Sequence, residues 1–359
     1  MMTLLIFALV LLLAWVNGAN DMAKGVATLA GAGVSSTRWA LAWATLCTVL
    51  GGLAAALWGG ELISVFSKGF LSAGFPLSLS FLGGVVIGAV AWVAIATRLG
   101  LPVSTTHALL GGIVGAALMV SGPESLRMAA ITNQALLPLL MSPLIAILLC
   151  WFLLLATKFV ENKIPAWSPG CCEQEEWQKN PFICATQSNP VSPWLRHTWT
   201  GLHWLSGGAT SFARALNDVP KIAAFLVLLI ALSPEFSKLK NESGIIWPIV
   251  LVSLTMGIGG LWGGLRILKV LAQRVTPLDT RNGLAANLST SLLVLAATPL
   301  GLPVSTTHVS TGALMGIRWA GGGKPSQRDA LNSILLGWII TLPVAALIAA
   351  LSVRTFLHL

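Results

Sequence analysis

Charged side chains make up only 9% of the 359 residues, whereas apolar ones make up 55%, and the mean hydropathy is +0.83. This scarcity of charge excludes a water-exposed surface over most of the chain. Helical membrane spans need about 20 apolar residues each, and the sequence supplies several such stretches between short polar turns. It therefore predicts an all-α integral membrane protein in a lipid bilayer, since a β-barrel would show only weak alternation.

A continuous stripe of basic residues is also missing, although the net charge is +9. The bases stand singly in turns, which argues against nucleic acid as a partner and is typical of cytoplasmic loops. The apolar first 16 residues have no basic leader, and the apolar pattern continues through residues 17–34. We therefore expect a retained first helix and no cleaved signal peptide.

The five cysteines lack the Cys-x-x-Cys spacing typical of zinc sites. Cys47 and Cys150 lie in apolar stretches, whereas Cys171, Cys172 and Cys184 share the central polar segment. We predict no metal site and no cofactor.

A nine-residue stretch occurs twice, because LGLPVSTTH at 99–107 returns unchanged at 300–308. An Asn-Asp-x-x-Lys element precedes each copy, at 20–24 and at 217–221. Such self-similarity indicates one structural unit encoded twice.

We accordingly predict three parts: a first transmembrane repeat at 1–157, a cytoplasmic linker at 158–205 and a second transmembrane repeat at 206–359. The linker holds the longest polar segment of the chain. Its tryptophans and bases between residues 194 and 206 are typical of a short helix at the membrane interface.

Equivalent loops of the two repeats differ in charge. The loop at 61–76 holds one base, Lys68, whereas the loop at 266–283 holds Arg266, Lys269, Arg274 and Arg281. This difference places the loops on opposite sides, with the second in the cytoplasm. If each Pro-Val-Ser-Thr-Thr-His turn joins a re-entrant hairpin, each half crosses three times. The repeats are then inverted, both termini lie outside, and the substrate site lies at the midplane.

Asp21 and Asp218 differ from the other acidic residues because they lie within predicted spans, followed by Lys24 and Lys221. A charge at bilayer depth costs roughly 2.5 to 3.5 kcal/mol. Mutual neutralisation at i, i+3 is the simpler interpretation, but it does not explain why such pairs occur twice. We favour a binding site.

Helix-breaking residues lie beside both elements. Gly18 precedes Asn20, and Pro220 follows Asn217 within the second element. They predict broken helices, which are tolerated at membrane depth only where they line a cavity or the protein interior.

In each copy of the repeated turn, a proline precedes three hydroxyl-bearing residues and a histidine. The residues are Ser104, Thr105, Thr106 and His107 in the first half and Ser305, Thr306, Thr307 and His308 in the second. The pattern predicts the start of a half-helix, whose unpaired amides and positive dipole end attract anions. One copy alone would indicate ordinary N-capping; two copies favour a cradle for a tetrahedral oxyanion. We expect the histidines to tie each hairpin to a neighbouring backbone.

These motifs resemble the inorganic phosphate transporter (PiT) family, whose duplicated signature is Gly-Ala-Asn-Asp-Val-Ala-Asn-Ala with a Pro-x-Ser-Thr-Thr-His loop in each half. Residues 18–24 (GANDMAK) follow the first signature, and 216–221 (LNDVPK) follow the second more loosely. The resemblance implies a symporter of inorganic phosphate in the cytoplasmic (inner) membrane, not an enzyme, and suggests a homodimer. It also implies that the Ser and Thr hydroxyls of the two repeated turns hold phosphate. The residues that would border the coupling cation are Asn20, Asp21, Asn217 and Asp218.

Three basic residues near the signatures distinguish this chain from the family pattern. Lys24 and Lys221 replace the later Asn of each signature, and Arg214 lies one turn before Asp218. An ammonium group can occupy the space of a sodium ion, so we expect proton coupling through Asp21 or Asp218, with both lysines near phosphate. The alternatives are sodium-coupled phosphate symport and transport of sulfate or a related oxyanion.

Two other classes of function fit less well. An intramembrane hydrolase using Ser104 and His107 would lack an orienting acid and would not need a second copy. A passive anion channel would use the same hydroxyls, but the embedded aspartates favour coupled transport.

Overall fold

The computed structural model describes residues 1–163, 193–239, 245–274, 280–320 and 328–357, which are helical almost throughout. The first half holds α1 (Met2–Asp21), α2 (Ala23–Gly31), α3 (Thr37–Trp58), α4 (Gly60–Ser64), η1 (Val65–Gly69), α5 (Leu79–Leu99), α6 (Thr105–Ser121), η2 (Pro123–Ser125), α7 (Met128–Ala130), η3 (Ile131–Leu136) and α8 (Leu137–Lys163). The second half holds α11 (Pro193–Leu232), η5 (Pro234–Leu239), α12 (Ile246–Gly263), α13 (Leu265–Arg274), α14 (Thr280–Ala297), α15 (Thr306–Trp319) and α16 (Arg328–Leu357).

Within these ranges, seven helices are long and apolar enough to cross a membrane. The prediction of an all-α protein with membrane-spanning helices is therefore confirmed.

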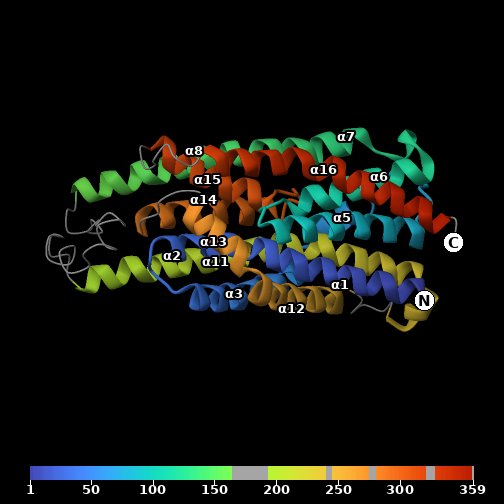
Figure 1. The fold of residues 1–359 in the computed structure, drawn as a ribbon, viewed down its shortest axis with the longest axis horizontal. Coiled ribbons are helices and arrows are strands. Elements are labelled where there is room, and N and C mark those ends of the chain that lie inside the picture. The colour runs from blue at the N-terminus through green and yellow to red at the C-terminus, as the bar shows by residue number, and fades with distance from the viewer. Residues whose placement is uncertain (164–192, 240–244, 275–279, 321–327, 358–359) are drawn as a thin grey trace.

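Matching helices run in opposite directions along the long axis of the molecule (Figure 1). We call the end where α1 begins and α16 ends the termini end, and the end where α8 finishes and α11 begins the linker end. Helix α1 runs from the termini end towards the linker end, whereas α11 runs back. Opposite courses of this kind are what inverted halves require.

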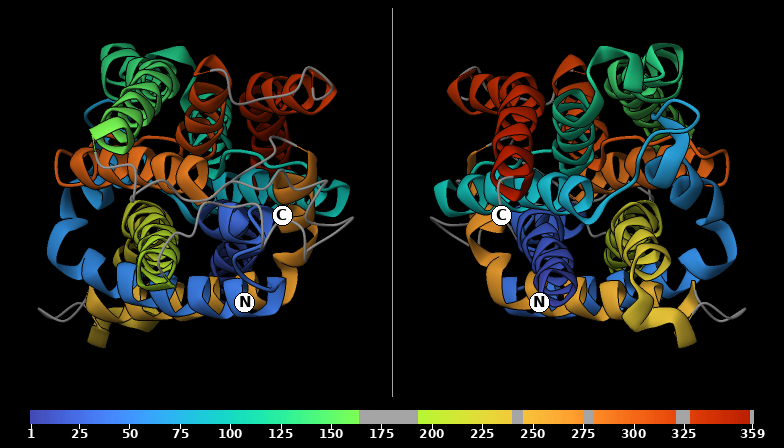
Figure 2. Two further views of the ribbon diagram at one scale, coloured as in Figure 1. Left: turned by 90° about the vertical axis from the view of Figure 1, so that its left-hand side faces the viewer. Right: turned by 90° about the vertical axis from the view of Figure 1, so that its right-hand side faces the viewer.

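Two helical hairpins enter this bundle from opposite ends. The α5–α6 hairpin lies towards the termini end and the α14–α15 hairpin towards the linker end, so their turns approach each other near the middle (Figure 1). In the end-on views, α5 and α14 lie between the layer of α1, α3, α11 and α12 and the layer that contains α8 and α16 (Figure 2).

The helices of the two predicted repeats interleave. Helix α1 packs against α12, and α11 packs against α3; likewise α6 packs against α16, and α15 packs against α8. Each of these contacts joins the first half to the second. A site between the hairpin tips therefore depends on both halves of the chain.

Glycines allow the interleaved helices to approach closely. A Cβ atom added at Gly259 of α12 would lie 2.0 Å from the carbonyl oxygen of Trp15 in α1, and one at Gly18 would lie 2.0 Å from that of Met256. The contact of α6 with α16 is as tight, since a Cβ at Gly115 would lie 2.0 Å from the Ala346 oxygen.

Gly259→Ala is expected to lower the free energy of unfolding by about 1 to 3 kcal/mol, because the backbone of α1 must shift to admit the methyl group. Gly201→Ala is the control, since nothing lies within 4 Å of a Cβ atom there and alanine favours helix by up to about 1 kcal/mol. Thermal unfolding in detergent measures both. Equal stability of the two variants would contradict the close contact.

The structure differs from the prediction of a broken helix at Pro220. Helix α11 continues through this proline from Pro193 to Leu232. Pro220 lacks the N–H that would bond the carbonyl of Leu216, but the flanking turns remain helical. In the first half the interruption is confined to Met22, between α1 and α2.

The boundaries of the predicted linker also differ. Helix α8 extends to Lys163 and α11 begins at Pro193, so both ends of the 158–205 segment are helical and 164–192 lies outside the described residues. The tryptophan-containing stretch expected to form a short interfacial helix is instead the first part of α11. Gly207 and Gly208 would favour a helix end after this stretch, but both pack closely against the first half, at Leu29 and Trp43, and α11 continues through them.

Candidate functional site

The tip of each hairpin is the Pro-Val-Ser-Thr-Thr-His turn at which its second helix begins, residues 102–107 and 303–308. The two tips contact each other directly. Thr307, in the first turn of α15, donates its hydroxyl to the carbonyl oxygen of Val103 at 2.8 Å. Thr106, in the first turn of α6, makes the equivalent contact to the Val304 oxygen at 3.4 Å. These residues are 201 positions apart in each case, so the tips face each other across an approximate two-fold axis.

Lys24 bridges the two tips from the first half. Its ammonium donates to the Asp21 carboxylate, to the Thr307 hydroxyl of the opposite hairpin, and to the Val103 carbonyl oxygen at 3.2 Å. A carboxylate, a hydroxyl and a carbonyl therefore surround one ammonium group.

Lys221 repeats this arrangement from the second half. It donates to the Thr106 hydroxyl at 2.8 Å, to the Val304 oxygen at 2.9 Å and to Asp218 at 3.3 Å. Asn217 accepts a further hydrogen bond from the same ammonium. The two lysines thus hold equivalent places on either side of the tip contact.

A third cation completes the cluster. The Arg214 guanidinium lies 3.7 Å from Asp218 and donates to Asn17 at 3.2 Å and to Thr48 at 3.0 Å. The five charged side chains, Asp21, Lys24, Arg214, Asp218 and Lys221, are each at most 5% exposed. Three cations therefore face two carboxylates in a buried site, which leaves an excess of one positive charge that suits an anion.

Both signature asparagines hold the turn before a hairpin tip. Asn20 donates to the Leu101 oxygen at 2.9 Å and to Thr97 at 3.0 Å, and its own oxygen accepts the Val103 amide at 3.1 Å. Asn217 donates to Thr298 at 3.0 Å. The asparagines therefore position the tips through side-chain and backbone contacts.

Sequence reasoning missed the two threonines that bind these asparagines. Thr97 and Thr298 are also 201 positions apart, each two residues before an LGLPVSTTH stretch. Extending the repeat by two residues would have found them.

Asn17 is a further partner that the sequence did not single out. Its amide donates to Thr105 at 2.9 Å and to Asp21 at 3.3 Å. Asn17 and Arg214 are 197 positions apart and therefore occupy matching places. No identity signals this match, because the two residue types differ.

The tip serines act as helix N-caps. Ser104 accepts the His107 amide at 3.2 Å, and Ser305 accepts the His308 amide at 3.3 Å. Capping uses an oxygen lone pair and leaves the hydroxyl hydrogen for another acceptor, and at Ser104 the same hydroxyl also lies 2.8 Å from His107 Nδ1. Capping and anion binding are therefore compatible at these serines.

The two tip histidines meet but have different partners. Their ring centroids lie 4.5 Å apart. His308 Nδ1 lies 3.3 Å from the Leu139 carbonyl oxygen in α8, as expected of a tie to a neighbouring backbone. His107 Nδ1 instead lies 2.8 Å from Ser104 in its own hairpin, which differs from that expectation.

Many hydrogen-bond donors gather around the tip contact. Two helix N-termini, six hydroxyls and three cations converge there, and such a set is chemically suited to an oxyanion. Thr106 and Thr307 at present point their hydroxyl hydrogens at carbonyl oxygens of the opposite tip. An anion between the tips would take over these two donors.

The family model of the phosphate transporter family matches residues 17–349. The chain belongs to this family. It is therefore a multi-pass membrane protein that transports phosphate and not an enzyme, so the hydrolase alternative is set aside. The resemblance recognised from the duplicated motifs is confirmed.

Relatives match over nearly the whole chain. A "Probable low-affinity inorganic phosphate transporter" of Rhizobium meliloti is 27% identical over 96% of this chain and 94% of its own length. A protein of the same description from Mycobacterium tuberculosis is 25% identical over 93% of this chain and 72% of its own. A solved structure titled "The sodium-dependent phosphate transporter" superimposes with a TM-score of 0.81 at 22% identity, covering 100% of this chain and 99% of that one. This last likeness shows a shared fold.

Proposed function

We propose that this phosphate transporter is a proton-coupled symporter of the cytoplasmic membrane in which two inverted halves hold phosphate between the hairpin tips. The proposed phosphate ligands are Ser104, Thr105, Thr106, Ser305, Thr306, Thr307, Lys24 and Lys221. One observation carries the proposal: each lysine ammonium binds oxygen atoms of both tips at once.

The surroundings of each lysine argue against coupling to sodium. Hard metal cations prefer carboxylate, hydroxyl and carbonyl oxygens, and Lys24 has one of each as partners. Lys221 has the same three kinds of partner. A tethered ammonium neutralises the site but cannot leave with the substrate. It therefore replaces a bound cation without coupling its gradient to transport.

Protons remain as the coupling ion. Asp21 and Asp218 are the carboxylates of the site, and membrane-embedded acids commonly serve as proton relays in transporters. Protonation of either one would break its ion pair with a lysine and release the ammonium towards phosphate. Loading of the proton and of the anion would then favour each other.

The distribution of bases supports a cytoplasmic linker end. Arg38 lies in the first turn of α3, Lys158 near the end of α8 and Arg318 in the last turn of α15. These three helix ends lie towards the linker end (Figure 1). The termini end carries Lys68, Arg127 and Arg354, and there the acids Glu124 and Glu235 partly balance these bases. Under the positive-inside rule, both termini lie outside.

Uptake of labelled phosphate into proteoliposomes tests the coupling. We expect an acid-outside gradient to drive accumulation, a sodium gradient at equal pH to change uptake less than two-fold, and sulfate to compete poorly. Accumulation driven by sodium alone would overturn proton coupling. Flux that never exceeds equilibrium would instead indicate a channel, and strong competition by sulfate would favour the broader oxyanion permease.

A further inference from the structure

A second buried polar cluster lies between the lysine site and the linker end. The Asn287 amide of α14 donates to Thr28 of α2 at 2.8 Å and to Ser206 of α11 at 3.2 Å. The Thr210 hydroxyl of α11 donates to the main-chain carbonyl oxygen of Asn287 at 3.0 Å. These side chains and His203 are at most 4% exposed. We refer to Thr28, His203, Ser206, Thr210 and Asn287 as the His203 cluster.

His203 is the unusual member of this cluster. Its side chain is fully buried, yet neither ring nitrogen has a hydrogen-bond partner among the described residues. The ring lies against Gly283, because a Cβ atom added there would lie 2.4 Å from His203 Nε2, and Thr28 borders the same glycine, with its Cβ 3.1 Å from that position. A buried polar group without a partner costs about 1 to 3 kcal/mol, so selection for packing alone would favour an apolar residue here.

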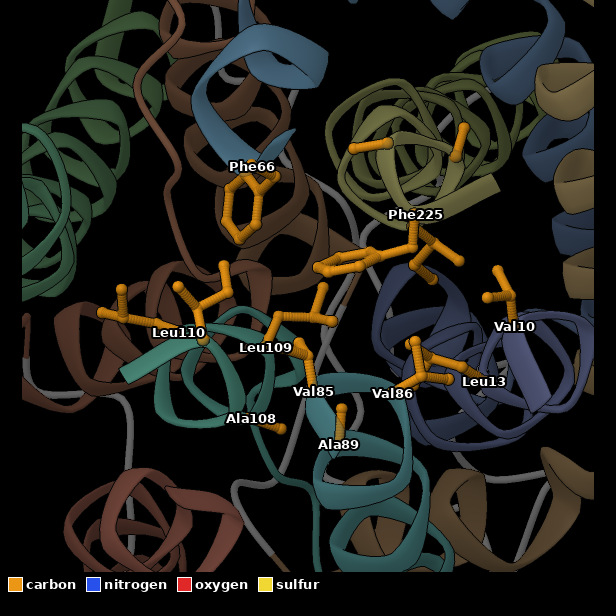
Figure 3. Close-up of a cluster of buried hydrophobic side chains, with 14 of the residues drawn as sticks. Val10, Leu13, Phe66, Val85, Val86, Ala89, Ala108, Leu109, Leu110 and Phe225 are labelled. Atoms are coloured by element: carbon orange, nitrogen blue, oxygen red, sulfur yellow. The ribbon is translucent and has the colours of Figure 1, made fainter. Parts of the chain in front are cut away.

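The matching positions of the other half are apolar. Shifting by the repeat offset of 197 or 201 residues replaces Thr28 by Phe225, His203 by Ile6, Thr210 by Leu13 and Asn287 by Val86. These four belong to one buried hydrophobic cluster. Figure 3 shows Phe225, Leu13 and Val86 there, with Val10 and Val85 beside them.

The two clusters lie on opposite sides of the lysine site. Thr28 follows Lys24 by one turn of α2, which runs towards the linker end. Phe225 follows Lys221 by one turn of α11, which runs towards the termini end. The duplicated site is thus bordered by polar side chains on one side and by an apolar cluster on the other.

We propose that the His203 cluster is a second phosphate-contacting station, on the path between the lysine site and the linker end. When α2, α11 and α14 separate, its hydroxyls, its amide and its imidazole would offer hydrogen bonds to the hydrated anion. The apolar cluster closes the path towards the termini end and excludes water. Its closure is favourable because the side chains that come together there have no polar groups that would lose hydrogen bonds to water. This inference rests on the proposed phosphate site. The experiments distinguish failure of the proposal for the His203 cluster from failure of the proposed function.

The first test is access of water to His203. In a background with all five cysteines replaced, His203→Cys is compared with Ile6→Cys, the matching position of the sealed side. A charged thiol reagent is applied to each membrane face in turn, and Arg38→Cys identifies the face at the linker end. We expect His203→Cys to react at least 10-fold faster than Ile6→Cys, only from that face, and more slowly with saturating phosphate. Equal rates, or no effect of phosphate, would overturn the proposal.

The second test separates transport from binding. Asn287→Val introduces the residue of the matching position. Ser289→Ala on the same helix is the control, because the Ser289 hydroxyl faces α8 and bonds, among the described residues, only the Ala146 oxygen. We expect Asn287→Val to slow uptake at least 10-fold with less than a three-fold change in phosphate Kd, and Ser289→Ala to change neither.

Unchanged uptake by Asn287→Val, or a parallel loss of phosphate binding, would overturn the station. Failure of the unaltered protein to accumulate phosphate would overturn the proposed symport instead. The two failures are therefore distinguishable in the same set of liposomes.

Discussion

Phosphate uptake by the double variant Lys24→Asn, Lys221→Asn is expected to fall at least about 100-fold in the absence of sodium and to recover at least 10-fold when sodium is added. Removing one partner of a buried ion pair costs about 3 to 5 kcal/mol, which corresponds to about two to three and a half powers of ten in an equilibrium constant. Asp21 and Asp218 would lose the ammonium groups that they now bind.

The recovery follows from the oxygen atoms that remain. Around Lys24 these are the Asp21 carboxylate, the Thr307 hydroxyl and the Val103 carbonyl, and asparagine adds an amide oxygen. The resulting set suits a hard cation. A sodium ion bound there would be free to leave with phosphate, so uptake would become coupled to its gradient.

The measurement is phosphate uptake into proteoliposomes with and without an imposed sodium gradient at fixed pH. Lys158→Asn is the control, because this exposed lysine contacts only the Ala320 oxygen among the described residues. Undiminished uptake without sodium would show that the lysines are not part of the transport site. Loss of uptake that sodium does not restore would contradict their role as tethered cations.

The repeated motifs in the sequence predicted which residues gather at the site. Pairing of Asp21 with Lys24, one turn apart on a helix, was the simpler of the two interpretations of the sequence, and the structure has that pair within the site. The contact between the tips follows from inversion of identical turns, which brings Thr106 and Thr307 to the same place. Local spacing and duplication were sufficient for these features.

Features that depend on distant packing could not be predicted. Thr48 binds Arg214 across 166 residues of sequence, and nothing in its own neighbourhood signals that partner. The course of α11 through Pro220 has a similar origin, since tertiary packing can override a local helix breaker. A Cβ atom at Gly59 would lie only 2.9 Å from the Pro220 ring, so α11 packs closely against the end of α3 at this point.

The sequence also did not predict that a polar cluster and an apolar cluster lie on opposite sides of the site. Alignment of the two repeats would have shown that the residue types differ at these positions. Asn287 and Val86 differ at matching positions, but only the packing shows that each borders the site. The two repeats share the residues of the proposed binding site, whereas the flanking positions differ. Under the proposal for the His203 cluster, this difference would distinguish the two directions of transport in an otherwise symmetric site.

Thr106→Val and Thr307→Val are each expected to raise the KM for phosphate about 10-fold, and the double variant about 100-fold. Valine keeps the shape of threonine and removes one hydroxyl, and a hydrogen bond to a charged group contributes about 1.5 to 3 kcal/mol. The two effects should be similar, because each hydroxyl contacts one lysine and one carbonyl of the opposite tip.

Similarity of the two effects is the decisive feature of this experiment, because a site shared by both tips must depend on both hydroxyls. Thr290→Val is the control, and it should leave the KM within two-fold. Within the part of the chain that the structure describes, the Thr290 hydroxyl bonds only its own helix, at the Ala286 oxygen. A loss confined to Thr106 or to Thr307 would place phosphate on one hairpin only. In that case the second copy of the motif would serve to hold the opposing tip, and the anion would lie beside the two-fold axis instead of on it.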